Sequence, residues 1–445
     1  MAAQKPAQEY RQVYVYIDGV ENLDRYDKGG YHPITVGDIL NKRYTIVDKL
    51  GHGGYSTVWV ARDMQQEEYI ALKIGVAKSR MQEISIMKSL SDLRSSLAAN
   101  SVSLSGFHAI PRLLDDFTIH GPNGEHPSYT TDLAGSNLDK SLNSGMFRID
   151  VARALAVKLV SAIAYMHGRG YVHGDIHLGN VMLRLPTNLG ELSVDQFYEK
   201  YGRPQTITVS RVDSSPVPPN LPVEAVYPLN LGKAARYVSL EETDLLLVDF
   251  GESFAPASTF RPCEECRSQK AAQPPETYFE PSSPFTFSAD IWCLGLVIWE
   301  LFSIRPLFGS SFLPRAALIA QNVDVLGPLP ARWWSVWKER HNYFDENGNS
   351  IQEENAFHPL PDVFDETVQG FRTRHKAGTF SVEEKSAFLR LMRRMLSVDP
   401  LQRASAAEVL ESDWVKNWAM HDFEKSWRSS RKIKRQTPVG SENDM

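Results

Sequence analysis

The chain has 445 residues, 42% of them hydrophobic and 23% charged, with a formal net charge of −6. That length fits two to three domains or one large two-lobed enzyme, and the composition can bury a core. The charge gives no sign of general nucleic-acid binding, and no apolar run reaches the roughly 18 residues of a membrane span. We therefore expect neither nucleic acid nor membrane as a partner. The first residues lack the apolar core of a signal peptide, which predicts a cytoplasmic protein.

Three strands are predicted in quick succession near the N-terminus. β-branched residues and alternation mark RYTIVDKL (43–50), TVWVARD (57–63) and YIALKIG (69–75), which together favour an antiparallel meander. A short helix fits QEISIMKSL (82–90). This part is expected to be a small β-rich unit that follows an N-terminal extension.

Four helices are predicted further along the chain. An amphipathic helix with a good N-cap starts at Asp150 and runs into Tyr171. Its apolar residues recur at i+4 spacing, namely Val151, Leu155, Leu159 and Ile163. The segment SADIWCLGLVIWELF (288–302) is apolar nearly all round, which is typical of a buried helix. Capping boxes, Ser381 with Glu384 and Ser405 with Glu408, begin the other two helices.

Two segments interrupt this order. Residues 186–243 include SSPVPPNLPVEAVYP, with five prolines in fifteen residues, which cannot sustain a helix or a central strand. We expect an insertion that is extended and partly mobile. The chain after Trp427 is basic and then polar, which predicts a solvated, disordered tail. A nuclear-import signal or a site for an acidic partner is the alternative for this tail, so the protein could also enter the nucleus.

The three cysteines predict no metal site. Cys263 and Cys266 form a single C-x-x-C, without a second pair or a histidine at ligand spacing, so a zinc ion would lack half of its ligands. A reduced pair on a loop is expected instead.

The glycine-rich stretch LGHGGYSTVWVARD (50–63) is a candidate phosphate-binding turn. Gly51 and Gly53 fall in a strand–turn–strand context, where glycine lets the backbone approach a phosphate and offer its N–H groups. Two glycines alone would equally fit a structural β-turn.

A lysine inside an apolar strand strengthens the phosphate hypothesis. Lys73 lies in YIALKIG, where an unpaired ammonium would be costly, and Glu83 on the predicted helix can pair with it. A lysine held by a carboxylate is how kinases fix the α- and β-phosphates of ATP. An ordinary surface ion pair on an edge strand is the alternative.

Three further polar residues complete a candidate catalytic set. Asp175 and Asn180 lie in YVHGDIHLGNVML (171–183), and LLLVDFGES (245–253) places Asp249 at the end of an apolar strand. The oxygens of Asn180 and Asp249 suit Mg²⁺, which prefers hard oxygen ligands. Asp175 can then accept the proton of a substrate hydroxyl. Each of these motifs alone is common, but the whole set in this order along the chain is highly specific.

From about Arg43 to Trp414 the sequence resembles the eukaryotic protein kinases, with DFG at Asp249–Gly251 and PPE at Pro274–Glu276 in place of APE. The resemblance implies an α+β, bilobal kinase fold. The small antiparallel-β N-lobe with one main helix would span residues 44–132. The larger, mostly helical C-lobe would span residues 133–414 and include the insertion. The flanking segments would be the extension 1–43 and the tail 415–445.

The same resemblance implies the residues of the site. Mg²⁺ would be held by Asn180 and Asp249, and the hinge would lie near Asp132–Ala134. The catalytic set would be Lys73, Glu83, Asp175, His177 and Asn180. ATP would contact Leu50, Gly51, His52, Gly53, Gly54, Tyr55, Ser56, Thr57, Val58, Ala71, Lys73, Leu133 and Thr131, the last as gatekeeper. In this family the Arg403 counterpart pairs with the Glu276 counterpart, and the Asp290 counterpart supports the catalytic loop.

A narrower resemblance is to the serine/arginine-rich-protein-specific kinases. The segment from Asp24 to Asp63 is similar over its whole length, and VDVLGPLPARWW (323–334) resembles the fungal members. Ser56 replaces the third glycine of the loop, Gly174 replaces the arginine before the catalytic aspartate, and a spacer splits the C-lobe. The resemblance implies phosphorylation of serines in arginine/serine-rich proteins linked to mRNA splicing, by a monomer. Gly174 further implies that phosphorylation of the activation loop is not the switch.

The catalytic loop departs from the family between Asp175 and Asn180. His177, Leu178 and Gly179 stand where Lys-Pro-Glu is usual, and losing that cation could cost on the order of 10²-fold in rate. The stretch HGDIHLGN also resembles the active loop of aminoglycoside and choline kinase relatives, so His177 can serve an active enzyme. A pseudokinase scaffold and a small-molecule kinase remain as alternatives.

Two acidic pairs are candidates for binding arginine-rich peptide. They are Glu264 with Glu265 in PCEEC, and Asp365 with Glu366 in VFDETV. Solvated surface charge is the alternative for both pairs.

Overall fold

The structure is a computed structural model that describes residues 13–79, 82–91, 101–185, 187–309, 312–351 and 358–436. The chain divides into two compact units. Unit 1 comprises Met1–Ile84, Arg112–Leu133 and Leu185–Leu231. Unit 2 comprises Ser85–Pro111, Ala134–Arg184 and Gly232–Met445. Most of the insertion thus belongs with the N-terminal sheet rather than with the predicted C-lobe.

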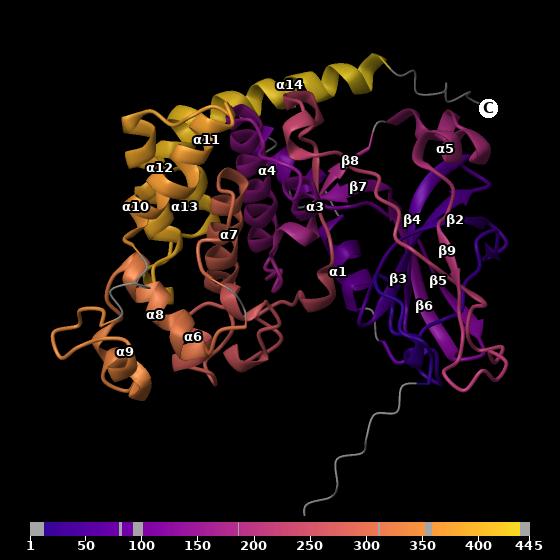
Figure 1. The fold of residues 1–445 in the computed structure, drawn as a ribbon. Coiled ribbons are helices and arrows are strands. Elements are labelled where there is room, and N and C mark those ends of the chain that lie inside the picture. The colour runs from indigo at the N-terminus through magenta and orange to yellow at the C-terminus, as the bar shows by residue number, and fades with distance from the viewer. Residues whose placement is uncertain are drawn as a thin grey trace, which may run out of the picture. The chain divides into compact units, whose positions relative to one another are not determined.

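Unit 1 is built on a six-stranded antiparallel sheet in the order β1-β2-β3-β4-β6-β5. Strands β2 to β6 are labelled in Figure 1. The strands of this sheet are β1 (Ile39–Leu40), β2 (Tyr44–Gly53), β3 (Ser56–Asp63), β4 (Glu68–Gly75), β5 (Leu113–Gly121) and β6 (Gly124–Asp132). The three predicted strands are therefore confirmed as β2, β3 and β4. On β4, Ile70, Leu72 and Ile74 are buried on one face, so the alternation of the strand directs Lys73 to the other face.

The insertion is folded, so the prediction of an extended segment was wrong. Helix α5 (Val194–Tyr201) begins with a capping box of Ser193 and Gln196, and Phe197 stacks on Tyr69 with ring centroids 4.7 Å apart. Strand β9 (Thr206–Thr208) pairs with β10 (Glu224–Val226). Most of its prolines lie in the connection between these strands, where they interrupt neither helix nor ladder.

The N-terminal extension joins the core of unit 1. Its apolar side chains form one buried cluster with residues of the insertion. The cluster contains Tyr14, Ile17, Val20, Leu23, Tyr26, Tyr31, Val76, Val209, Leu221 and Ala225.

Unit 2 is mostly helical and is centred on α4 (Ile149–Gly168) and the buried α7 (Phe287–Phe302). A small sheet of order β11-β8-β7 is formed by β7 (Ala134–Asn137), β8 (Val181–Arg184) and β11 (Leu245–Leu247). The helix predicted at residues 82–90 is confirmed as α1 (Gln82–Leu90). The boundary between the two units falls within this helix. The other helices are α2 (Ser101–His108), α3 (Leu138–Leu142), α6 (Glu276–Phe279), α8 (Arg315–Leu326), α9 (Ala331–Trp334), α10 (Leu360–Phe364), α11 (Gly370–Arg374), α12 (Val382–Met395), α13 (Ala406–Leu410) and α14 (Met420–Gln436).

Two of the predicted helix starts differ in detail. The N-cap of α4 is Arg148 rather than Asp150, whose carboxylate instead pairs with Arg148 at 2.7 Å. Ser405 and Glu408 form the complete capping box expected for α13. Ser381 caps α12, but the Glu384 carboxylate is bound by a guanidinium of α4 and does not close the box.

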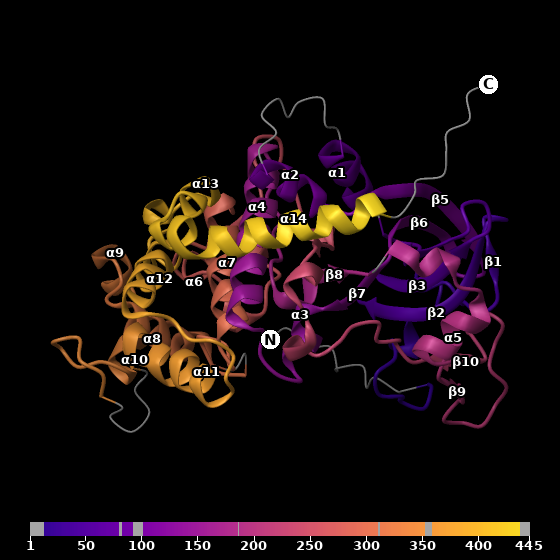
Figure 2. The same cartoon turned by 90° about the horizontal axis from the view of Figure 1, so that it is seen from above.

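The predicted disorder after Trp427 is wrong as far as Gln436. Helix α14 packs along α4 (Figure 2) and buries Phe423 and Trp427. Ser426 of the same helix accepts a 2.7 Å hydrogen bond through its hydroxyl from the buried ammonium of Lys158. Residues 437–445 lie outside the described residues. Within the part of the chain that the structure describes, no helix is both long and apolar enough to cross a bilayer.

Candidate active site

Unit 1 contains the ion pair that the sequence predicted. Lys73 Nζ on β4 lies 2.8 Å from Glu83 Oε2 in the first turn of α1. The side chains are only 16% and 5% exposed, so each charge needs the other as a partner. β4 is a central strand, and Lys73 is therefore not part of an ordinary pair at a sheet edge.

The glycine-rich turn joins β2 to β3 in unit 1. The register pairs Gly51 with Val58 and Gly53 with Ser56, and Gly54 and Tyr55 make the turn. Neither Gly51 nor Gly53 has a positive φ, and a Cβ built on either would meet no atom within 4 Å. Neither backbone conformation nor packing thus requires glycine here, which weakens the β-turn alternative and leaves room for a close ligand.

Other predicted ATP contacts also gather in unit 1. Leu50 and Ala71 pack on one apolar cluster with Leu133. The register of β4 and β6 places Thr131 opposite Ala71. The boundary between the units falls after Leu133, inside the hinge predicted at residues 132–134.

In unit 2 the catalytic loop is held by one buried carboxylate. Asp290 accepts hydrogen bonds from the backbone N–H of His173 at 2.7 Å and of Gly174 at 2.9 Å, as the family resemblance implied. Within the loop, the Asn180 amide donates to the Asp175 carbonyl at 2.9 Å. These contacts fix the backbone on both sides of the Asp175 side chain.

The glycine before Asp175 is required by the fold. Gly174 has φ +84°, and a Cβ built there would lie 2.6 Å from the carbonyl oxygen of Glu252. Arg261 donates to the same carbonyl at 2.8 Å and pairs with the Glu252 carboxylate at 3.1 Å. The absence of the usual arginine is thus coupled to close packing of the segment after DFG, which the sequence analysis did not foresee.

His177 and Gly179, the two residues at which the loop departs from the family sequence, also contact each other. His177 Nδ1 accepts a 3.1 Å hydrogen bond from the Gly179 N–H, and a Cβ on Gly179 would lie 2.7 Å from the imidazole Cε1. The other ring nitrogen, Nε2, lies 3.5 Å from Asp175 Oδ2. Although burial favours the neutral ring, the hydrogen bond to Asp175 and nearby carboxylate charges outweigh it and raise the pKa of His177.

The two candidate Mg²⁺ ligands lie at the ends of paired strands. β11 pairs with β8, and the Val248 N–H donates to the Asn180 carbonyl at 2.9 Å, which brings Asp249 next to Asn180. Asp249 has φ 66° and ψ 76°, a left-handed conformation that is costly for a residue with a Cβ and is often found at functional sites.

The donor set of this pair fits Mg²⁺. The Asn180 amide nitrogen is used on the Asp175 carbonyl, so its amide oxygen is the atom available to a cation. Among the described residues, no group of three or more His, Cys, Asp or Glu could hold a metal alone. One amide and one carboxylate oxygen match an ion that usually completes its shell with phosphates and water.

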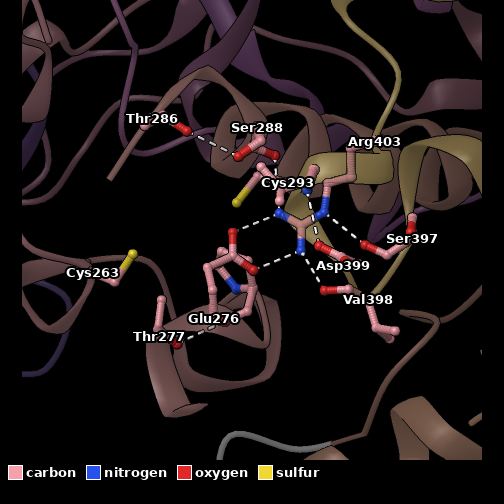
Figure 3. Close-up of polar contacts among 12 residues, drawn as sticks. Cys263, Glu276, Thr277, Thr286, Ser288, Cys293, Ser397, Val398, Asp399 and Arg403 are labelled. Carbon is pink, nitrogen blue, oxygen red and sulfur yellow. Dashed lines mark hydrogen bonds and ion pairs between the residues drawn. The ribbon is translucent and has the colours of Figure 1, made fainter. Parts of the chain in front are cut away.

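A buried ion pair supports the C-terminal part of unit 2 (Figure 3). Arg403 Nη1 and Nη2 each lie 2.6 Å from a carboxylate oxygen of Glu276, which is the pairing that the resemblance implied. Arg403 also donates to the carbonyls of Ser397 at 2.8 Å, Ser288 at 3.1 Å and Val398 at 3.2 Å.

The remaining candidates from the sequence are the two cysteines and the two acidic pairs. Cys263 and Cys266 are free thiols. Asp365 pairs with Lys385 at 2.5 Å, and Glu366 pairs with Arg305 at 3.0 Å. Glu264 and Glu265 lie in the 3₁₀-helix Cys263–Glu265 and are both exposed. Internal partners thus already compensate the charges of Asp365 and Glu366.

Comparison with known proteins agrees with these observations. No family model matches the chain. A serine/threonine protein kinase of Aspergillus fumigatus is 26% identical over 410 residues, which cover 89% of this chain and 90% of that protein. The protein kinase dsk1 of Schizosaccharomyces pombe is 24% identical, with coverage of 91% and 86%. A solved kinase domain superposes with a TM-score of 0.56 at 17% identity and covers 86% of this chain and 98% of its own.

Fold, site residues and relatives together define a protein kinase of the serine/threonine class. Within that class the chain is also similar, over a shorter stretch, to a relative from Homo sapiens. Human SRSF protein kinase 3 is 30% identical over 172 residues, which are 37% of this chain and 29% of the human protein.

Proposed function

We propose that the chain transfers the γ-phosphoryl group of ATP, with Mg²⁺, to serines in arginine/serine-rich proteins linked to mRNA splicing. The observation that carries the ATP site is the Lys73–Glu83 ion pair on a central strand, next to a turn whose glycines the fold itself does not require. A paired lysine can hold the α- and β-phosphates, and the glycine-rich backbone can approach them.

The residues of unit 2 supply the chemistry of transfer. Asp175 accepts the proton of the attacking serine hydroxyl, because its backbone is fixed and its side chain is only 24% exposed. His177, held by Gly179 and near Asp175, donates from Nε2 toward transferred oxygen in place of the usual lysine. Asn180 and Asp249 would hold Mg²⁺, which when bound neutralises charge on the phosphates.

The electrostatics around His177 support a basic substrate. Burial, and next the charge of Asp139, raise the pKa of Glu300 to about 7, and His177 opposes this shift. Asp139 also contributes to the raised pKa of His177. Several carboxyl groups thus share one region with the catalytic aspartate, and an arginine side chain placed there would be favoured by the ionised ones and would in turn favour ionisation of Glu300.

The packing at Gly174 supports constitutive activity. Arg261 of the activation segment is bound to Glu252, and the Gly174 backbone contacts the same residue closely. A protein group therefore already supplies the cation–carboxylate contact that orders this segment. We expect no need for a phosphorylated residue, and a many-fold rise in activity after activation-loop phosphorylation would contradict this.

The test is transfer of radiolabelled phosphate from ATP with Mg²⁺. The substrates are an Arg-Ser repeat peptide, the same peptide with each serine replaced by alanine, and a generic basic protein. Label on the Arg-Ser peptide alone, abolished in Asp175→Ala, is expected. Transfer to the basic protein alone would refute the substrate class. ATP binding without transfer to any of these substrates would refute the substrate class and favour a scaffold or a different substrate.

A further inference from the structure

A segment before the kinase-like sequence contacts the glycine-rich turn directly. We name residues 21–31 the N-terminal brace. Tyr31 Oη donates a 2.7 Å hydrogen bond to the carbonyl of Gly53, which is the last residue of β2. All of these residues belong to unit 1. The contact links the extension to the part of the sheet that the proposed function assigns to the ATP phosphates.

The Tyr31 hydroxyl is itself held in position. Arg25 Nη1 donates to it at 3.2 Å, and the guanidinium carbon lies 5.0 Å from the centre of the Tyr31 ring. A charged donor polarises the hydroxyl and strengthens the hydrogen bond that it gives to Gly53. Burial raises the pKa of Tyr31, so the hydroxyl keeps its proton at neutral pH.

The brace is anchored to β2 by buried charges. Glu21 forms an ion pair with Lys49, which immediately precedes Leu50 of the glycine-rich stretch, and both side chains are almost completely buried. Tyr26 Oη donates to the same carboxylate at 2.5 Å. Removing one member of a buried pair leaves an uncompensated charge, so this anchor is costly to break.

The brace also binds the segment between β4 and α1. The N–H groups of Ala77 and Lys78 donate to the carbonyls of Gly30 and Gly29, at 3.0 Å and 3.1 Å. A Cβ on Gly30 would lie 1.8 Å from the Arg25 carbonyl oxygen, and Gly29 has φ +91°. The two glycines before Tyr31 are thus needed for the backbone to pass this point.

We propose that Tyr31 is a positioning residue of the nucleotide site that fixes the glycine-rich turn before ATP binds. In a trans peptide the carbonyl of Gly53 and the N–H of Gly54 point in opposite directions. Holding the carbonyl toward the brace therefore fixes the direction of the Gly54 N–H. The inference rests on the proposed function, because it assigns this preorganisation to phosphate binding.

The test compares Tyr31→Phe with Tyr44→Phe. The control also removes a tyrosine hydroxyl from unit 1, but one that donates to Asp115 at 2.7 Å. Loss of one hydrogen bond of about 1 kcal/mol corresponds to a roughly fivefold change. We expect Tyr31→Phe to raise KM for ATP about fivefold, with kcat and the peptide KM unchanged and the control close to wild type.

Hydrogen exchange of the nucleotide-free protein tests the contact independently of activity. Amides of Gly54 and Tyr55 should exchange severalfold faster in Tyr31→Phe and not in the control. Unchanged exchange would overturn the proposal whatever the kinetics, as would faster exchange with unchanged KM for ATP. Failure of the proposed function is recognised separately, because wild type would then either not bind ATP or bind it without transferring phosphate. If Tyr31→Phe does not fold, Arg25→Gln should change both readouts in the same direction, by less, and no change would overturn the proposal.

Discussion

Replacing Gly174 by alanine tests whether packing against Glu252 is what requires glycine before Asp175. The left-handed backbone alone should cost about 1–2 kcal/mol for a residue with a Cβ. The new Cβ would also lie 2.6 Å from the Glu252 carbonyl, and such overlap typically costs about 1–3 kcal/mol. We therefore expect a total of about 2–5 kcal/mol in free energy of unfolding, unless the segment after DFG moves.

Gly170→Ala is the matched control because it separates the two costs. Gly170 has φ +82°, close to the +84° of Gly174, but a Cβ there would meet nothing within 4 Å. The free energy of unfolding of Gly170→Ala should therefore fall only by the backbone cost of about 1–2 kcal/mol, and this variant should keep its activity.

Urea denaturation and kcat on the Arg-Ser peptide measure both variants. If Gly174→Ala relieves the overlap by moving Glu252, its stability will approach that of Gly170→Ala while kcat falls at least tenfold. Equal stability and equal kcat in the two variants would refute the reasoning.

Three further predictions concern charged and titratable side chains. His177→Gln should lower kcat on the order of 10²-fold. Wild-type kcat should fall as pH rises through the raised pKa of His177, because the protonated ring carries the charge of the usual lysine, although its Nδ1 then no longer accepts from the Gly179 N–H. Profiles of kcat against pH that have the same shape in both proteins would argue against this charge. Arg403→Met leaves Glu276 buried without its partner and should cost about 3–5 kcal/mol in urea unfolding, most of it recovered when Glu276→Leu is added; no recovery would count against the pair. Burial lowers the pKa of His32 to about 4, so the unfolded chain binds more protons below its ordinary pKa of about 6.5. Stability should therefore fall between pH 6.5 and 4, by up to about 3 kcal/mol, and an unchanged pH slope in His32→Gln would exclude this cause.

The sequence determined those features that depend on neighbouring residues. Alternation located β2, β3 and β4, and i+4 spacing located α4, because a strand or helix imposes its period on the residues that it buries. The partner of Lys73 could also be predicted, since an ammonium inside an apolar strand needs one. Motif order then gave the kinase fold.

Local composition failed where distant segments meet. The prolines of the insertion suggested an extended chain, but Phe197 is buried against Tyr69, which is 128 positions earlier in the sequence. The basic residues after Trp427 suggested disorder, but α14 gains its stability from the side chains that it buries along α4. Neither partner is visible from the composition of the segment itself.

The two glycines at which the catalytic loop departs from the family sequence also show what the sequence reveals and what only the structure reveals. From the sequence, Gly174 and Gly179 could only be noted as missing side chains. At Gly174 the tertiary structure shows why no side chain fits, since the carbonyl of the distant Glu252 lies against it, whereas at Gly179 the crowding atoms belong to the neighbouring His177 ring. The sequence by itself thus determined the candidate residues of the site, because motif spacing is local. Only the folded chain decided which substitutions the site tolerates, because steric exclusion depends on atoms that come from distant segments.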